Sequence, residues 1–362
     1  MVAGRSRLLL ALCALTACTP ALKPGSDRLD GGRPDVPSPR PDATADVADA
    51  GRTDAPRADV PPDVPVPSSR QTSCPDPSER GCGVVEVSGG TFSMGVSDGR
   101  LVTDGSPAQP GITVSSFAVD AYEVTLARFR RFWAAARTVP LLTAVRYPGG
   151  NLPVAQGVRE PQTPGDDPGC NWTAAPGQRE LHPVNCIDWY TAMAFCAWDG
   201  GRLPTDAEWE FVARGRDVGG LQPGRLYPWG DEDISRDCDR ARWNLTGCMG
   251  EDGAETRRVG SFAPSPELDG ARVYDLSGNV FEWTADNYAA YNNSDGRGCW
   301  GSAPGGRTNP LCLFNPRGPR TIRGGSWYFS TIEVLRAPSR FGIEVDGTLP
   351  LVGVGIRCAR SR

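Results

Sequence analysis

Apolar side chains recur at helical spacing in two central segments of the chain. Residues 126–136 follow Thr125, which can cap a helix, and place four apolar side chains on one face: Phe129, Phe132, Trp133 and Ala136. Residues 187–199 repeat the pattern and stop at a glycine pair, with three side chains expected to face inward: Trp189, Met193 and Cys196. The pattern therefore predicts two helices that each bury one face.

A third helix and several short strands complete the predicted elements. Thr205 and Glu208 form a capping box at the start of the third helix. Alternating runs at 84–95 and 112–125 predict strands, the first of them with a hairpin. Beyond Gly215 the chain is broken by Gly and Pro, with short strands expected at 273–278, 321–328 and 353–359. We expect an α+β fold with much irregular backbone.

The first 18 residues are typical of an export signal. Arg5 and Arg7 precede an apolar run, residues 8–15, that is too short to span a bilayer. Its end, Leu-Thr-Ala-Cys at 15–18, resembles the bacterial lipobox, which implies cleavage before Cys18 and lipid attachment to that residue. Thr19 at the next position favours the outer membrane by the same resemblance. An ordinary secretory signal is the alternative.

Residues 19–73 contain no aromatic side chain and are crowded with Pro, Asp, Ala and Arg. This composition buries too little apolar surface to fold. We expect a disordered tether averaging roughly 40 Å end to end as a coil, followed by one folded domain at 74–362. A partner-binding proline-rich segment is the alternative. Because no second apolar span follows, lipid on Cys18 would be the membrane anchor.

Charge and cysteine content narrow the possible functions. A net charge of -5 gives no basic field for nucleic acid, so a nucleic-acid partner is not expected. Of the 12 cysteines, Cys13 lies in the signal and Cys18 is the lipid site, which leaves an even number; in an exported chain these predict disulfides. Zinc is disfavoured because no C-x-x-C occurs and His182 is the only histidine.

Eight motifs occur in a fixed order: GGTFSMG, YEVT, HPV before a tryptophan-containing helix, RLPTDAEWEFVARG, YPWGD, YDLSGNVFEWTAD, RGGSW and GVGIRC. Their content and order resemble the formylglycine-generating enzyme (sulfatase-modifying factor) family over about residues 84–360. The resemblance implies a modified C-type-lectin-like fold, loop-rich and disulfide-bonded, with bound calcium. It also implies oxidation of a sulfatase cysteine to formylglycine with oxygen and copper.

The resemblance fails at the two cysteines on which that oxidation depends. They would lie five and ten positions after Gly324, where this chain has Phe329 and Val334. A phenyl ring and a branched hydrocarbon can neither hold Cu(I) nor exchange with a substrate thiol. No cysteine lies between Cys312 and Cys358, so copper is not expected. A related family's iron site needs three histidines, and His182 alone is expected to be a packed imidazole.

The family resemblance also implies disulfides. One family pair corresponds to Cys196 and Cys358, both present, and another to Ala213 and Ser339, where both cysteines are absent. The first pair would close a long loop, which contributes about 4 to 5 kcal/mol in the chain-entropy model. Proximity along the chain suggests four further pairs: Cys74 with Cys82, Cys170 with Cys186, Cys238 with Cys248, and Cys299 with Cys312.

Two oxygen-rich loops match the calcium sites that the resemblance implies. The first offers the carboxylates of Asp275 and Glu282 with the carbonyls of Gly278 and Val280, a donor set that suits calcium. A tight turn without metal is the alternative there. The second set is Asn244 and the Leu245 carbonyl with Asp252 and the Ala254 carbonyl. Either ion would be structural, because it would bind only the folded state.

The family's substrate groove maps to Arg323, Ser326 and Trp327. Our leading hypothesis is a lipid-anchored surface protein whose domain binds a protein, peptide or glycan without oxidising it. Two alternatives remain: a copper-dependent oxidase that uses unrecognised residues, and calcium-dependent carbohydrate recognition, which rests only on the likeness to lectin folds. For Trp327 a position in the core is an alternative to a place in the groove.

Overall fold

The computed structural model describes residues 71–97, 107–136, 144–148, 150–153, 158–215, 224–232, 238–245, 247–262, 272–292, 299–300, 307–345 and 352–362. The predicted export signal, Cys18 and residues 19–70 of the predicted tether lie outside these ranges. Gln71 and Ser73, which we assigned to the tether, are buried, so the described domain begins before the expected start at Cys74.

The three predicted helices are confirmed as α2 (Leu126–Ala136), α3 (Trp189–Trp198) and α4 (Asp206–Arg214). The capping box is present: Thr205 accepts from the Glu208 backbone N–H, and the Glu208 side chain accepts from that of Thr205. Asp188 caps α3 by accepting from the Thr191 N–H. A short 3₁₀ helix, η1 (Ile332–Leu335), lies where the family has its second cysteine.

The strands form small sheets with the orders β1-β4-β12, β10-β9-β7-β11, β2-β3-β8 and β5-β6. Their bounds are β1 (Val84–Val87), β2 (Gly90–Met94), β3 (Gln109–Val114), β4 (Phe117–Asp120), β5 (Ala144–Tyr147), β6 (Gly150–Pro153), β7 (Phe281–Asn287), β8 (Arg307–Thr308), β9 (Arg320–Arg323), β10 (Arg340–Ile343), β11 (Val354–Gly355) and β12 (Ala359–Ser361).

Two strand predictions are wrong. β1 and β2 do not form a hairpin, because β1 pairs with β4 and β2 pairs with β3. Residues 273–276 are irregular and residues 277–278 form a bend, so the expected strand is absent there. Asp275 has φ 58° and Gly278 φ 79°, left-handed conformations that end a pleated strand.

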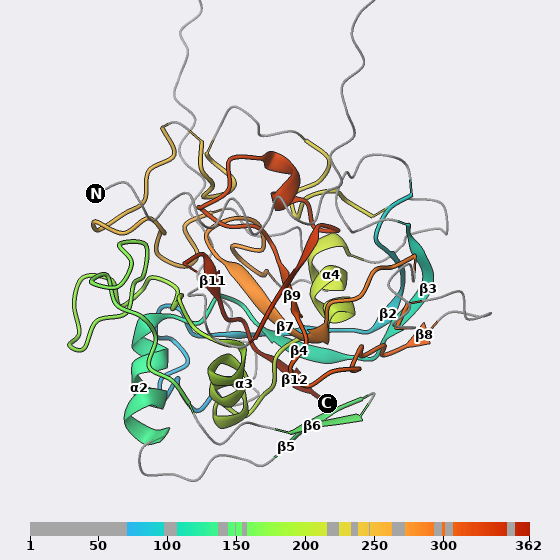
Figure 1. Ribbon diagram of the computed structural model, residues 1–362, viewed down its shortest axis with the longest axis horizontal. Coiled ribbons are helices and arrows are strands. Elements are labelled where there is room, and N and C mark those ends of the chain that lie inside the picture. Colours follow the sequence, from blue (N-terminus) through green and yellow to red (C-terminus); the bar gives the residue numbers. More distant parts are fainter. Residues whose placement is uncertain are drawn as a thin grey trace, which may run out of the picture. The chain divides into compact units, whose positions relative to one another are not determined.

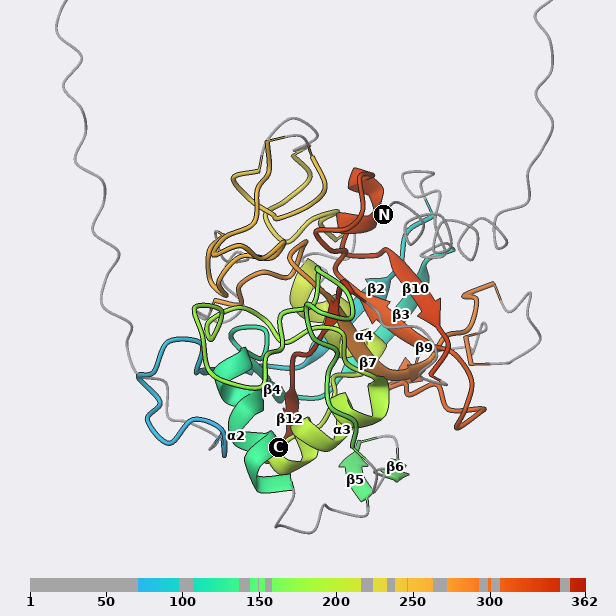
Figure 2. The same cartoon turned by 60° about the vertical axis from the view of Figure 1, so that its left-hand side comes forward.

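The helices cover the sheets from different sides. α4 packs against β2, β3, β7 and β9, and in Figure 1 it lies between the strands β7 and β9 on one side and β2 and β3 on the other. α2 and α3 contact each other and lie beside β12 in Figure 2. One apolar cluster gathers α2, α3 and β7, and a second gathers α4 with β1 to β4. The fold is therefore α+β with short sheets, as the sequence predicted.

A closed ring of buried charges joins four segments that are distant in the sequence. Asp120, Arg128, Asp199 and Arg360 form it, and we call it the ion-pair ring. Arg128 Nη2 lies 2.9 Å from Asp120 Oδ2 and 2.8 Å from Asp199 Oδ2, and Arg360 contacts the same two carboxylates at 2.5 and 2.8 Å. Burial alone would raise the pKa of Asp120, but Arg128 and Arg360 outweigh it and hold the pKa below its ordinary value.

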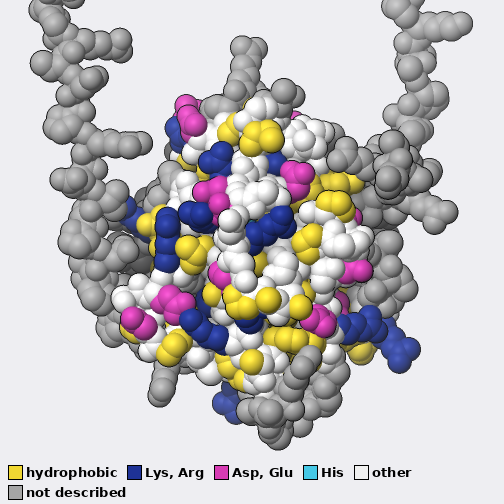
Figure 3. All heavy atoms as spheres, turned by 90° about the vertical axis from the view of Figure 1, so that its left-hand side faces the viewer, with side chains coloured by type: hydrophobic (Ala, Val, Ile, Leu, Met, Phe, Trp, Pro, Cys, Tyr) yellow, Lys and Arg dark blue, Asp and Glu magenta, His cyan; other side chains and the backbone are white. Residues whose placement is uncertain are grey.

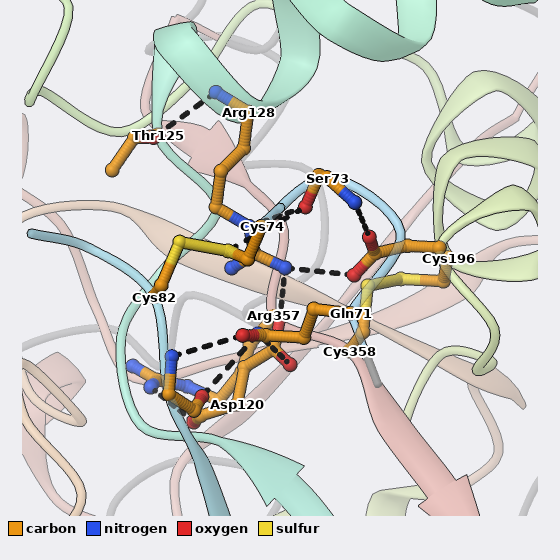
Figure 4. Close-up of polar contacts among 12 residues, drawn as sticks. Gln71, Ser73, Cys74, Cys82, Asp120, Thr125, Arg128, Cys196, Arg357 and Cys358 are labelled. Carbon is orange, nitrogen blue, oxygen red and sulfur yellow. Dashed lines mark hydrogen bonds and ion pairs between the residues drawn. A yellow bond between two sulfur atoms is a disulfide. The ribbon is translucent and has the colours of Figure 1, made fainter. Parts of the chain in front are cut away.

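The start of the described domain is held by this ring (Figure 4). Gln71 Nε2 donates to Asp120 Oδ1 at 2.9 Å, and the Ser73 backbone N–H donates to Asp199 Oδ1 at 2.6 Å. Ser73 Oγ accepts from Arg128 Nε at 2.8 Å. Asp120 and Asp199 also lie close to Cys358. That group is no metal site here, because arginines occupy both carboxylates and Cys358 is in a disulfide.

All five predicted disulfides are confirmed: Cys74–Cys82, Cys170–Cys186, Cys196–Cys358, Cys238–Cys248 and Cys299–Cys312. Cys196–Cys358 joins residues separated by 162 positions and ties α3 to the segment before β12. In the chain-entropy model, loops of this length contribute most to stability.

No helix in the described ranges is both long and apolar enough to cross a bilayer. On the face drawn in Figure 3, the described basic and acidic side chains are interspersed with apolar ones. Charge of one sign therefore does not gather among the side chains visible there.

Candidate functional site

The glycine pair Gly324 and Gly325 forms a sharp turn directly after β9. Gly324 has φ 93° and Gly325 φ 74°, conformations that glycine adopts at little cost. A Cβ on Gly325 would lie 2.7 Å from Leu335 Cδ2 and 2.9 Å from the Val334 carbonyl oxygen. Only glycine therefore allows η1 to approach the turn so closely.

Two backbone hydrogen bonds fasten this turn to the 278–279 loop. The Gly278 N–H donates to the Gly324 carbonyl at 2.8 Å, and the Trp327 N–H donates to the Asn279 carbonyl at 3.1 Å. The turn of the predicted groove and the loop of the first predicted calcium site are thus one structural unit.

Arg323 does not line a groove, which corrects our prediction. Its side chain is fully buried, and its five N–H groups reach five acceptors: Asp206, Glu210, Tyr291 and the Ala337 and Ser339 carbonyls. No donor is left for a ligand. Arg323 instead joins β9 to the start of α4, where Arg340 also contacts Asp206 at 2.7 Å.

Trp327 and Tyr328 are half-buried, whereas Ser326, which we also expected to line the groove, is fully buried, so that prediction is wrong as well. The Trp327 ring packs against Val352 and the Cys170–Cys186 disulfide, and a Cβ on Gly169 would lie 2.7 Å from it. The indole N–H of Trp327 is buried without a hydrogen-bond acceptor among the described residues. Trp327 is therefore part of a small core and also partly open to the surface beside the turn.

The two family cysteine positions are apolar and packed. The Phe329 ring centroid lies 5.5 Å from that of Phe281 and 6.3 Å from that of Phe341, and Val334 is 5% exposed. Every cysteine within the described ranges is in a disulfide. Those ranges therefore contain no thiol that could hold Cu(I) or exchange with a substrate cysteine.

The first predicted calcium set is only partly free to bind a cation. Both oxygens of Glu282 contact Arg357, at 2.7 to 3.0 Å, and Glu282 Oε2 also accepts from the Trp209 indole N–H at 2.6 Å. Asp275 Oδ2 accepts from the Gly260 N–H, while Asp275 Oδ1 is buried with no hydrogen-bond partner among the described residues. Asp275 therefore has a free ligand atom, and Glu282 is already neutralised.

Glu123, which sequence reasoning missed, is a third buried carboxylate beside this pair. It accepts from Asn279 Nδ2 at 2.6 Å and from the Val280 N–H at 3.2 Å. Burial raises its pKa well above the ordinary value, and the charges of Asp275 and Glu282 raise it further. Burial likewise raises the pKa of Asp275 to about 6. Glu123 lies in the YEVT motif, but nothing in the sequence indicates that it contacts Asp275, which is far away along the chain.

The second predicted set is occupied by protein contacts. The Asp252 carboxylate contacts Arg258 at 2.8 Å and His182 Nε2 at 3.3 Å. The exposed Asn244 side chain donates to the Tyr328 carbonyl at 3.2 Å. Because Arg258 already neutralises Asp252, this set fits a cation less well than the first. His182 is a packed imidazole, as expected, and burial lowers its pKa.

The fold and the turn define a formylglycine-generating-type domain, and comparisons with known proteins agree. Residues 69–362 match the sulfatase-modifying factor enzyme 1-like domain. The chain is 36% identical over 281 residues to the formylglycine-generating enzyme of Thermomonospora curvata, covering 69% of this chain and 84% of that protein. It is also 34% identical over 314 residues to the inactive C-alpha-formylglycine-generating enzyme 2 of Bos taurus, covering 76% and 87%.

Among solved structures, PvdO from Pseudomonas aeruginosa shares the fold, with 23% identity, a TM-score of 0.50, and coverage of 77% of this chain and 94% of that one. This chain belongs to the FGE-sulfatase domain family.

The raised pKa of Asp275 predicts a pH dependence in metal-free protein. Because the folded-state pKa of about 6 exceeds the ordinary 3.8, the stability from this carboxyl is present at low pH and lost as pH rises between about 4 and 6. With a chelator present to remove metal, the free energy of unfolding of Asp275→Asn should therefore rise relative to that of the wild type as the pH increases from about 4 to 6. The gain should be on the order of 2–3 kcal/mol by urea unfolding.

Asp252→Asn is the matched control. Arg258 lowers the pKa of Asp252, so the stability that this carboxylate contributes to the wild type should be lost as pH falls, the reverse of the trend for Asp275. Parallel stability profiles for Asp275→Asn and the wild type would contradict the assignment.

Proposed function

We propose that this protein is a non-oxidising member of its family that binds a protein, peptide or glycan at the surface around Trp327 and Tyr328. The observation that carries the proposal is the chemistry at the two cysteine positions. Phe329 packs in an aromatic cluster and Val334 is buried, so the turn is kept and the copper ligands are replaced. The similarity to the inactive C-alpha-formylglycine-generating enzyme 2 of Bos taurus also supports a non-oxidising role.

The retained turn explains how binding can persist without oxidation. Gly324, Gly325 and the 278–279 loop hold the backbone rigidly, and the half-buried rings of Trp327 and Tyr328 lie at its surface. Aromatic side chains beside a rigid turn supply apolar contact area at low entropic cost.

An oxidation assay tests the proposal. Purified protein is incubated with copper, oxygen and a cysteine-bearing sulfatase peptide, and the peptide is analysed by mass spectrometry. We expect the cysteine to remain unmodified because no thiolate is available to bind Cu(I). The Thermomonospora curvata enzyme serves as the positive control. The aldehyde product formed by the wild-type protein would establish an oxidase instead.

Phe329→Cys with Val334→Cys is the matched variant for copper binding. It places two thiols at the family positions, so it should bind Cu(I) in competition with a chromogenic chelator where the wild type does not. Equal Cu(I) binding by both proteins would place the copper ligands elsewhere.

We also propose that calcium binds at the first predicted set as a structural ion. Three buried carboxylates, Glu123, Asp275 and Glu282, surround one arginine, Arg357. When all three are ionised they leave an excess of negative charge over Arg357, and Asp275 Oδ1 has no hydrogen-bond partner among the described residues. A hard cation suits such oxygens. Asp275, with Glu123 nearby, would hold the ion, and the Gly278 and Val280 carbonyls remain the proposed backbone ligands; Glu282 would act through its charge.

Calcium should raise the melting temperature of the wild type, because an ion bound only by the folded state stabilises it. At pH 7 with 1,000 times Kd of calcium, the gain in free energy would be about 4 kcal/mol. Asp275→Asn should lose most of this gain, whereas Asp252→Asn should keep it. Differential scanning calorimetry with calcium or chelator measures the effect, and an equal gain in both variants would refute this site.

We further propose that the protein is exported and anchored through lipid on Cys18, in the outer membrane by the Thr19 signal. A palmitate label in bacterial cells should enter the wild type, while Cys18→Ser should take up none and fractionate away from membranes. Cys13→Ser is the control and should be labelled like the wild type. Labelling of Cys18→Ser would show that the anchor lies elsewhere.

A further inference from the structure

The Cys238–Cys248 disulfide closes a loop that lies against the candidate binding surface. In the described part of this loop, the Asn244 backbone N–H donates to the Phe329 carbonyl at 3.0 Å, and the Asn244 side chain donates to the Tyr328 carbonyl at 3.2 Å. The loop therefore holds two neighbouring residues of that surface by their carbonyl groups. None of the functions proposed above uses this disulfide.

The same loop is also bonded to the 278–279 loop through Arg242. The Asn279 N–H donates to the Arg242 carbonyl at 2.8 Å, and the Arg242 side chain donates to the Glu255 carbonyl at 2.7 Å. Arg242 thus has anchors of its own. Asn244, two residues further on and closer to Cys248, connects the disulfide-closed loop to the surface.

The Cys238–Cys248 disulfide is more open to solvent than most others in the domain. Cys238 is half-buried, whereas Cys248 is 4% exposed. Among the disulfide-bonded cysteines of the described ranges, all except Cys238 and Cys299 are buried. Thiol–disulfide exchange requires that an attacking thiolate reach one of the two sulfurs, so exposed disulfides are the labile ones. Cys238 gives an external thiol such an approach.

We propose that Cys238–Cys248 is a redox switch: an external dithiol opens it, and its opening frees Asn244 from the surface around Tyr328. A thiolate of the dithiol attacks Cys238 Sγ and breaks the Sγ–Sγ bond, and Cys248 leaves as a thiolate. The second thiolate of the dithiol then displaces Cys238. Two electrons pass to the protein pair, each protein thiolate takes up a proton that the dithiol gave up, and the dithiol leaves as its own disulfide.

The rest of the domain should withstand this opening. Cys196 and Cys358 are both 0% exposed, so a dithiol in solution does not reach them while the domain is folded. Cys238–Cys248 joins residues separated by 10 positions, against 162 for Cys196–Cys358. A short loop contributes less to stability than a long one in the chain-entropy model. Reduction of Cys238–Cys248 therefore loosens one loop and leaves the fold in place.

The consequence for binding rests on the function proposed above. In the reduced protein Asn244 no longer fixes the carbonyls of Tyr328 and Phe329, so this part of the surface loses more conformational entropy when a ligand orders it. The reduced state is therefore the weaker-binding one. The experiments below follow reduction and backbone protection, neither of which needs a ligand, so their failure is distinguishable from failure of the proposed function.

Timed alkylation tests whether this disulfide opens in the folded protein. The full-length chain is treated with dithiothreitol, quenched with iodoacetamide at intervals and digested for mass spectrometry. We expect Cys238 and Cys248 to be labelled at least about tenfold faster than Cys196 and Cys358. Equal labelling rates for the two pairs would overturn the proposal.

Hydrogen exchange measured by NMR tests whether opening releases the loop. In the wild type the Asn244 amide is protected by its bond to the Phe329 carbonyl. In the double variant Cys238→Ser with Cys248→Ser, this amide should exchange at least about tenfold faster. The same Asn244 protection in the double variant and the wild type would contradict the switch.

Cys299→Ser with Cys312→Ser is the matched control. It also removes a disulfide between one half-buried and one buried cysteine, but Cys299 and Cys312 belong to the second apolar cluster, whereas Cys238 and Cys248 belong to the first. The Asn244 amide should stay protected in this control. Equal loss of protection in both double variants would show a general loosening of the domain and refute the proposal.

Reversibility separates a switch from a purely structural disulfide. Wild-type protein reduced at Cys238–Cys248 should regain the protection of the Asn244 amide when oxidised glutathione re-forms this pair. If the double variant does not fold, the reduced wild type supplies the exchange measurement in its place. Protection that does not return after the disulfide has re-formed would establish a structural role only.

Discussion

The ion-pair ring is the constraint on which the arrangement of the described domain depends. It joins the end of β4, the first turn of α2, the end of α3 and β12, and it also receives Gln71 and Ser73. Buried charges are costly to desolvate, and removing one partner of a buried pair is strongly destabilising, so the folded domain needs all these segments in place together. The Cys196–Cys358 disulfide beside the ring makes the same connection covalently. Arginine suits this role because it stays charged when buried, and Lys23 is the only lysine in the sequence.

The same reliance on buried arginine shapes the candidate site. Arg323 and Arg340 neutralise the start of α4, and Arg357 neutralises Glu282 under the 278–279 loop. These ion pairs are buried beneath the turn at Gly324 and hold it in position, and none of their side chains is exposed at the surface of the turn. The scaffold that presents the turn is thus separate from the side chains that would act on a ligand. For that reason the copper ligands can be exchanged for Phe329 and Val334 while the turn keeps its form.

Several features could be predicted because they depend on neighbours in the chain. Helix caps, apolar faces and four of the disulfides join residues that are close in sequence, and local spacing is enough to find them. Cys196–Cys358 spans the domain and was found only through the family resemblance. Arg323 was misplaced because a charged side chain next to a groove motif gives no sign that five acceptors surround it in the interior. Glu123 was missed because it meets Asp275 only after folding.

The sequence by itself determined which chemistry is available: Phe329 and Val334 cannot act as soft copper ligands in any conformation, because side-chain composition does not change on folding. Only the tertiary structure decided where charge is neutralised. It paired Glu282 with Arg357, left an oxygen of Asp275 without a partner, and buried Arg323. It also paired β1 with β4 in place of β2. These outcomes follow from burial and long-range pairing, which bring together residues whose separation along the chain carries no information about their contact.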